Sequence, residues 1–202
     1  MASEMSDGSE PGMHKGLPIK QFSSADDWRL WLSANQDTSN GLWLQIAKKG
    51  SAVPSVTYDE ALDEALCYGW IDGQKAAFDE SMWLQKFSPR GRNSIWSKRN
   101  RERAEQLFEN GRMQKRGSLA IEQAKANGSW DNAYASQREM EVPADFLQAL
   151  NANAAARAFF ETLSGANRYA LLFRIQTAKK PETRTRRIRE FVDMLTRHET
   201  FH

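Results

Sequence analysis

Apolar and polar residues follow two different periods along this chain of 202 residues, and each period predicts a kind of element. In the first half, Trp28, Trp31 and Leu32 have helical spacing, and Ser24 is placed to cap the start of that helix. The run 42–47 (LWLQIA) is short, apolar and followed by Lys-Lys-Gly, which is typical of a strand. Helices and strands are therefore expected to mix in this half.

A second helix is predicted after Thr57, which can form a capping box with Glu60. Gly69 is suited to end that helix, and a short strand is expected at about 68–71. Residues 81–88 (SMWLQKFS) alternate without a cleanly apolar face and predict a further strand. These elements favour a small sheet of about three strands with two packed helices.

The second half of the chain has helical spacing only. Apolar residues recur at i, i+3, i+4 and i+7 in its last segment, at Ile188, Phe191, Val192 and Leu195. Six helices are expected in all, near 97–110, 115–126, 143–150, 152–163, 167–177 and 182–197. The predicted fold class is α+β, with the small N-terminal sheet and its packed helices followed by an all-α helical C-terminal region.

The domain organisation follows from the same pattern. Residues 1–20 are rich in Ser, Gly, Glu and Pro, have little to bury and are expected to form a disordered tail. The α+β unit is assigned to 21–110, and the helical region to 111–202.

Composition limits where in the cell the protein is expected and which kinds of catalytic or metal site it can hold. The acidic, polar N-terminus does not resemble a signal peptide, and no apolar run reaches membrane-spanning length, so we expect a cytoplasmic protein without a membrane span. The single cysteine excludes an internal disulfide framework. His14, His198 and His202 lie near the ends, so no histidine-based metal site or triad is expected. We predict no metal, no cofactor and no catalytic residue, and the sequence does not specify an oligomeric state.

Charge is distributed unevenly along the chain. Residues 1–85 hold 6 basic and 13 acidic side chains, whereas residues 86–117 hold 10 basic and 3 acidic ones. Residues 168–202 are basic as well, with 9 basic and 4 acidic side chains. We favour intramolecular pairing between the acidic and basic segments over a basic face for an anionic partner.

The best candidate for a binding site is the second half of the segment 57–100, where arginines and tryptophans meet at the start of a helix. Arg90 and Arg92 offer planar forks for a carboxylate or phosphate, and Ser94, Ser97 and the free backbone N–H groups could complete a cradle. The ligand would be an anionic small molecule or an acidic peptide. The full predicted set is Trp70, Asp72, Arg90, Arg92, Ser94, Trp96, Ser97, Lys98 and Asn100.

Two alternatives remain open. The basic segments 86–117 and 168–202 could form a nucleic-acid-binding module. An enzyme could use Asp72 as acid or base with Cys67 or Ser94 nearby. Cys67 itself favours packing, because a helix C-terminus and nearby carboxylates raise the pKa of a thiol.

Several short motifs follow one another along the chain: Trp43-Leu44 with Lys48-Lys49, Tyr58–Gly73, Phe87–Arg90, Ser94–Asn100, Gly111–Met113, Ala124–Trp130, Val142-Pro143, Glu182–Arg184 and Arg187-Ile188. In this order they resemble the YdeI/OmpD-associated family, also described as bacteriocin-protection proteins. Together they extend over about residues 22–197. The resemblance implies a small α+β unit followed by a helical region, and a link to envelope stress and antimicrobial-peptide resistance. It carries over no reaction and no catalytic residue.

Overall fold

The structure is a computed structural model, and it describes residues 12–201. The chain divides into two compact units. The first holds the described residues up to Ser94 together with Glu102–Gln123, and the second holds Ile95–Arg101 together with the chain from Ala124 onward. The division therefore falls inside the two helices α3 (Lys98–Glu109) and α4 (Lys115–Ala126), whereas the sequence had placed a boundary near residue 110.

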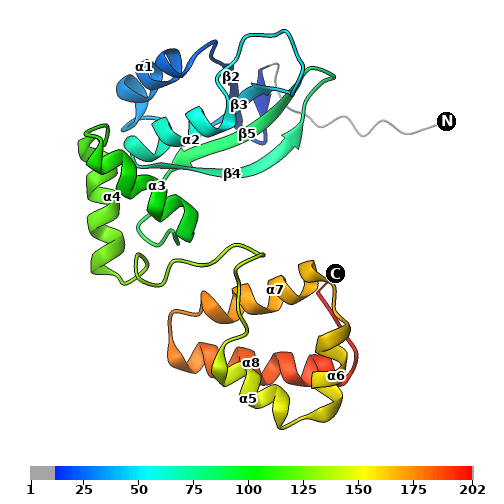
Figure 1. The fold of residues 1–202 in the computed structure, drawn as a ribbon. Helices are drawn as coiled ribbons and strands as arrows, with labels where there is room; N and C mark the ends of the chain where they lie inside the picture. The colour runs from blue at the N-terminus through cyan, green and yellow to red at the C-terminus, as the bar shows by residue number, and fades with distance from the viewer. Residues whose placement is uncertain (1–11, 202) are drawn as a thin grey trace, which may run out of the picture. The chain divides into compact units, whose positions relative to one another are not determined.

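The first unit is built on a mixed sheet of five strands in the order β1-β2-β3-β5-β4 (Figure 1). Its strands are β1 (Met13–His14), β2 (Leu17–Gln21), β3 (Leu42–Ala47), β4 (Trp70–Ala77) and β5 (Met82–Pro89). β2 and β3 run parallel, and the other neighbouring strands are antiparallel. The α+β class is thus confirmed for this unit.

The number of strands was wrong, because three were expected and the sheet has five. β1 and β2 lie where the composition predicted the end of a disordered tail; residues 1–11 of that tail lie outside the described residues. The last three residues of β2 pair in parallel with Trp43–Gln45. The edge of β3 therefore provides the hydrogen-bond partners for a strand that has no alternating pattern of its own.

The helices of the first unit also lie between strands rather than only after them. α1 (Ala25–Asn35) follows β2, and α2 (Tyr58–Cys67) follows β3. The predicted caps are confirmed: Ser24 accepts a hydrogen bond from the backbone N–H of Asp27, and Thr57 forms a complete capping box with Glu60. These caps satisfy N–H groups that a helix start otherwise leaves unpaired.

Trp28 joins both helices to the sheet. Its side chain is fully buried, and its ring centroid lies 6.2 Å from that of Trp70 on β4 and 5.6 Å from that of Phe87 on β5. Its Nε1 donates a hydrogen bond of 3.0 Å to the backbone oxygen of Ala61 on α2. One aromatic side chain thus contacts α2 and both strands at this end of the sheet.

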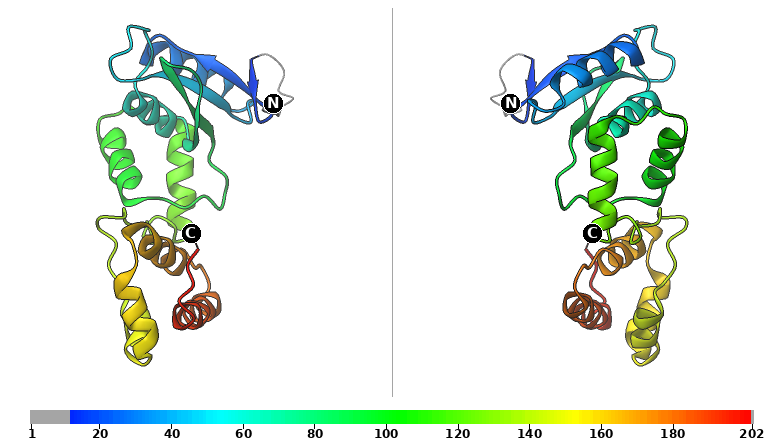
Figure 2. Two further views of the ribbon diagram at one scale, coloured as in Figure 1. Left: turned by 90° about the vertical axis from the view of Figure 1, so that its right-hand side faces the viewer. Right: turned by 90° about the vertical axis from the view of Figure 1, so that its left-hand side faces the viewer.

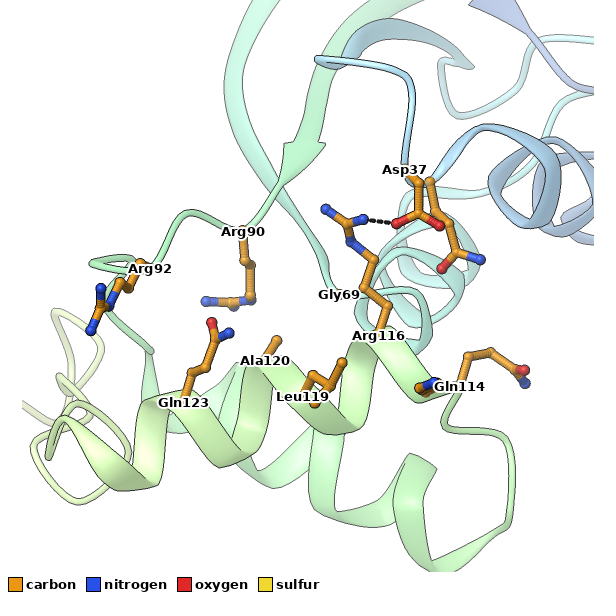
Figure 3. Close-up of a pocket in the computed structure, with 11 residues that line it drawn as sticks. Asp37, Gly69, Arg90, Arg92, Gln114, Arg116, Leu119, Ala120 and Gln123 are labelled. Atoms are coloured by element: carbon orange, nitrogen blue, oxygen red, sulfur yellow. Dashed lines mark hydrogen bonds and ion pairs between the residues drawn. The ribbon is translucent and has the colours of Figure 1, made fainter.

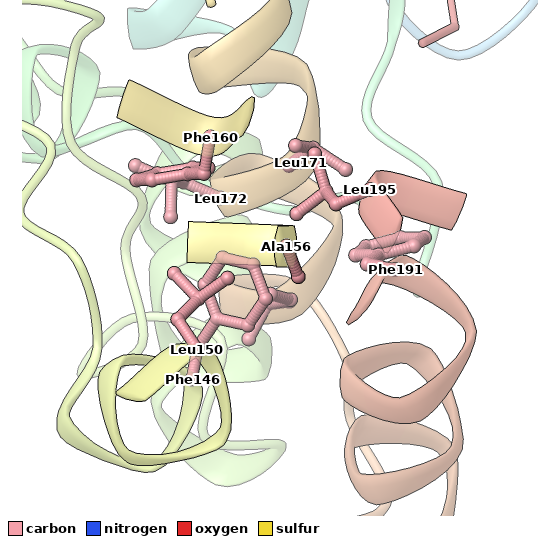
Figure 4. Packing of buried hydrophobic residues seen from close by; sticks show 9 residues of the cluster. Phe146, Leu150, Ala156, Phe160, Leu171, Leu172, Phe191 and Leu195 are labelled. Atoms are coloured by element: carbon pink, nitrogen blue, oxygen red, sulfur yellow. The ribbon is translucent and has the colours of Figure 1, made fainter. Parts of the chain in front are cut away.

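The second unit is helical, as predicted, and contains α5 (Ala144–Asn151), α6 (Ala154–Thr162), α7 (Gly165–Gln176) and α8 (Pro181–Thr196) (Figure 2). Aromatic and aliphatic side chains from all four helices form one core (Figure 4). Its buried members are Phe146, Leu150, Ala156, Phe160, Leu171, Leu172, Ile175, Phe191 and Leu195. Helical periodicity had identified this core face on the last helix, since Phe191 and Leu195 belong to it.

None of the helices within residues 12–201 combines the length and the apolar character that a membrane span requires.

Candidate functional site

A pocket of about 650 Å³ lies within the first unit, between the loop that follows β5 and one face of α4 (Figure 3). Four parts of the chain meet there: the segment that follows α1, the turn at Gly69, the loop after β5, and α4 with the residue before it. The lining residues are Gln36, Asp37, Gly69, Arg90, Arg92, Gln114, Lys115, Arg116, Leu119, Ala120 and Gln123. Arg90 and Arg92, the two arginines at the centre of the predicted site, are therefore on one pocket wall.

Backbone contacts position the walls of this pocket. Gly69 ends α2 in the left-handed region, with φ of +70°, and its carbonyl oxygen accepts a hydrogen bond of 2.9 Å from the N–H of Arg90. The N–H of Gln114 donates to the carbonyl oxygen of Cys67 at 3.1 Å, which fastens the start of α4 to the end of α2. Main-chain atoms thus determine where Arg90 and the first turn of α4 lie.

One face of α4 forms a second wall. Arg116, Leu119, Ala120 and Gln123 have the spacing i, i+3, i+4 and i+7, which places them on one side of a helix, and all four line the pocket. Figure 3 shows Leu119 and Ala120 between Arg116 at one end and Gln123 at the other, with Arg90 directed toward α4 near Gln123. The wall is therefore apolar in the middle and polar at both ends.

Positive charge predominates around the pocket. Arg90, Arg92, Lys115 and Arg116 line it, and Asp37 is the one carboxylate among the lining residues. Asp37 forms an ion pair with Arg116, as Figure 3 shows. The lining side chains therefore carry a net charge of +3 at neutral pH, which favours an anion.

Three other predicted residues of the first unit lie apart from this lining. Trp70 is fully buried in the core, so its ring offers no surface to a ligand. Asp72 is half-buried and accepts a hydrogen bond of 2.8 Å from the hydroxyl of Tyr58. The N–H of Ser94 donates to the carbonyl oxygen of Gly91 at 2.9 Å, which closes the turn that carries Arg92.

The remaining four predicted residues belong to the second unit. Trp96 is buried there, with its ring edge-on to Trp130 at 4.8 Å between centroids. Ser97 caps α3 by accepting a hydrogen bond of 3.1 Å from the N–H of Asn100. The N–H of Lys98 donates to the carbonyl oxygen of Tyr134 at 2.9 Å. The nine residues predicted as one site are thus divided between two compact units.

Of the two side chains suggested to act with Asp72 in an enzyme, Cys67 is unsuited to that role. Cys67 is 1% exposed, and burial raises the pKa of its thiol to about 12, with a further contribution from the carboxylate of Glu64. A thiol with that pKa stays protonated near neutral pH and is a poor nucleophile. The prediction that Cys67 serves packing is confirmed.

Two arginines of the first basic segment pair with the acidic face of α2. Arg103 binds Asp59 at 2.9 Å and also contacts Asp63, and Arg112 binds Glu64 at 2.7 Å. This confirms intramolecular charge pairing for that segment. In the second basic segment, Arg184 binds Asp145 through two hydrogen bonds of 2.7 and 2.8 Å. These pairs use three of the positive charges proposed for phosphate contacts, and the pairing itself does not support the nucleic-acid alternative.

Sequence reasoning missed Asp37 and every pocket residue contributed by α4. A signal for α4 was present, because the spacing of Arg116, Leu119, Ala120 and Gln123 predicts a common face. Only the fold shows that this face lines a pocket. No comparable signal exists for Asp37, which lies in a turn 79 positions before Arg116.

Comparison with known families assigns both halves of the chain. Residues 20–120 match the model described as "Domain of unknown function (DUF8412)", and residues 139–198 match the one described as "Bacteriocin-protection, YdeI or OmpD-Associated". No curated protein and no solved structure matches the chain significantly. The motifs from Val142 to Ile188 lie within the second match, as the resemblance implied, whereas those from Trp43 to Met113 lie within the first match and Ala124–Trp130 lies outside both. The chain therefore belongs to the DUF8412 family through residues 20–120 and carries a YdeI/OmpD-associated, bacteriocin-protection domain at residues 139–198.

Proposed function

We propose that the pocket formed by Arg90, Arg92, Arg116 and the neighbouring face of α4 binds a small anionic molecule. The observation that carries this proposal is the charge of the lining, where four cationic side chains face a single carboxylate. That carboxylate, Asp37, is already paired with Arg116. An anion entering the pocket therefore gains attraction and meets little repulsion from the lining.

The side chains suit recognition of a carboxylate or phosphate. Guanidinium groups present several N–H donors in one plane and can bind two oxygens of an anion at once. The amides of Gln114 and Gln123 add hydrogen-bonding groups that carry no charge.

The size of the pocket favours a small molecule over an acidic peptide. Its volume of about 650 Å³ lies within the range of about 300–1,000 Å³ that is usual for small-molecule sites. Only a few residues of an extended peptide would fit inside a pocket of this volume, so most of the peptide would lie outside it. An acidic peptide that binds at this site with an affinity above that of every small anion would contradict this choice.

The test is a calorimetric titration of the full chain with inorganic phosphate and with benzoate at low ionic strength. The variant Arg90→Ala/Arg92→Ala is expected to lose at least tenfold in affinity for both probes, since each charge-assisted hydrogen bond is worth roughly 1.5–3 kcal/mol. Arg29→Ala is the matched control, because Arg29 is an exposed arginine of the same unit outside the pocket. Equal affinities in the wild type and the double variant would refute the proposal.

We further propose a role in protection against antimicrobial peptides from a cytoplasmic location. The support is the match of residues 139–198 to a model whose description names bacteriocin protection. Bacteria that express the wild-type chain are expected to survive such peptides better than bacteria that express Arg90→Ala/Arg92→Ala. The same cultures test the location by cell fractionation. Equal survival of the two strains at equal protein levels would show that the pocket is not needed for protection. Recovery of the protein in the membrane fraction would contradict the cytoplasmic location.

A further inference from the structure

We infer that the ligand of this pocket is an elongated dianion with an apolar middle, an inference that rests on the anion-binding function proposed above. The chemical class is a chain-like molecule with an acidic group at each end, such as an α,ω-dicarboxylate. Neither an inorganic anion nor a compact organic acid has this distribution of charge and apolar surface. The argument uses the order of side chains along α4 and the charges at its two ends.

The length follows from the helix. Arg116 and Gln123 are seven residues apart on one face of α4, and an α-helix rises about 1.5 Å per residue, so the two ends of the wall are about 10 Å apart. Gln123 lies next to Arg90 in Figure 3, and Arg116 lies next to Asp37. A ligand that contacts both ends must therefore reach about 10 Å along the helix axis.

Both ends of the wall are cationic. Arg90 lies near Gln123, and Arg92 lines the pocket from the same loop, so this side of the pocket carries two positive charges. Lys115 and Arg116 contribute two at the other end, of which Asp37 compensates one through its ion pair with Arg116. Among the lining side chains, cations therefore outnumber carboxylates at each end, and a ligand with one acidic group would contact the cations of one end alone.

The middle of the wall is apolar. Leu119 and Ala120 lie between the two charged ends, and the side chain of Leu119 is 45% exposed. A methylene chain laid over these side chains would remove apolar surface from water on both partners, which contributes about 25 cal/mol per Å². A hydrated inorganic ion gains nothing from that contact.

Calorimetric titration of the full chain with four probes tests this inference. Octanedioate has two carboxylates and an extended chain that suits the spacing, octanoate lacks one carboxylate, and butanedioate is too short to reach both ends. Inorganic phosphate measures the charge effect alone. Octanedioate is expected to bind about tenfold more tightly than each of the other three, because one added ion pair or one buried chain is worth about 1.4 kcal/mol or more.

Two variants separate the contributions. Lys115→Met is expected to lower the affinity for octanedioate to that for octanoate, while the affinity for octanoate stays the same. Leu119→Ser is expected to weaken both chain-bearing probes severalfold and to leave phosphate unchanged. Leu147→Ser is the matched control, since Leu147 is also 45% exposed but lies in the other unit.

Failure of this inference is distinguishable from failure of the proposed function. Equal affinities for octanedioate, octanoate and phosphate, all dependent on Arg90 and Arg92, would overturn the dianion and keep the anion site. The absence of measurable octanedioate binding would also overturn it. Octanedioate binding that persists in Arg90→Ala/Arg92→Ala would refute the anion site itself.

Discussion

Gly69 and Arg116 approach each other backbone to backbone: a Cβ atom added to Gly69 would lie 2.8 Å from the carbonyl oxygen of Arg116. Both residues line the candidate pocket, and Gly69 also accepts the hydrogen bond that holds the N–H of Arg90. The positive φ of Gly69 and this close approach both require a residue without a side chain. The position of α4 against the end of α2 therefore depends on Gly69, and also on Gly117, where an added Cβ would clash with the carbonyl oxygens of Leu66 and Cys67.

Gly69→Ala is expected to destabilise the protein more than Gly50→Ala does. Both glycines have a positive φ, which costs an alanine about 1–2 kcal/mol, but a Cβ on Gly50 would meet no atom within 4 Å. The clash with Arg116 should add about 1–3 kcal/mol to the cost at Gly69. Denaturant unfolding measures both free energies, and equal losses in the two variants would contradict the close packing.

Cys67 is expected to be inert toward a thiol reagent at pH 8 in the native protein and to react fully in denaturant. Its pKa of about 12 leaves almost no thiolate at that pH, and the side chain is buried. The chain has one cysteine, so the absorbance of the released reagent reports on this residue alone. Rapid labelling of the native wild type that Cys67→Ser abolishes would show that the thiol is accessible and ionised.

Arg112→Met is expected to lower the free energy of unfolding by about 1–3 kcal/mol, because it leaves the carboxylate of Glu64 without its cation. The side chain of Glu64 is 8% exposed, whereas that of Arg112 is 45% exposed. Solvent therefore screens the ion pair in part, which reduces the loss of stability expected when Arg112 is replaced. In a protein that already carries Glu64→Gln, Arg112→Met should lower the free energy of unfolding by less, because no carboxylate is left without its cation. Arg157→Met removes an exposed helix pair and is expected to cost under about 1 kcal/mol. An equal cost with and without the Glu64 carboxylate would refute the coupling.

The pair between Asp145 and Arg184 is expected to make the stability of the helical unit depend on pH. Hydrogen bonding from Arg184 lowers the pKa of the Asp145 carboxyl below its ordinary value. Its stabilisation is therefore complete above the unfolded pKa of about 3.9 and is lost as the pH falls through the lower, folded pKa. The difference in thermal midpoint between the wild type and Asp145→Asn should be constant from about pH 7 to pH 5 and shrink toward acid. A difference in thermal midpoint that grows toward acid pH would contradict the prediction, because it would mean that folding raises the pKa of Asp145.

Local sequence determined the elements whose signals lie within a few residues. The capping pair Thr57 and Glu60, the helix end at Gly69 and the apolar stripe of α8 were all predicted from adjacent positions. The arginines of the candidate pocket wall, Arg90 and Arg92, were also identified from one loop. The predictions of the cap, the helix end and the apolar stripe succeed because capping, left-handed glycines and helical periodicity involve neighbours in the chain.

Tertiary structure decided what depends on partners far away in the sequence. β2 forms because the edge of β3 provides its hydrogen bonds, and Trp70 is a core residue because Trp28 packs against it. Asp37 and Arg116 form an ion pair although they are 79 positions apart in the sequence, and no local pattern predicts that pair. Hydrogen bonding and burial are satisfied by whichever residues the fold brings together. The sequence alone therefore identified the two arginines, whereas the fold decided that Arg90 is directed toward α4 and that Arg92 lines the same pocket.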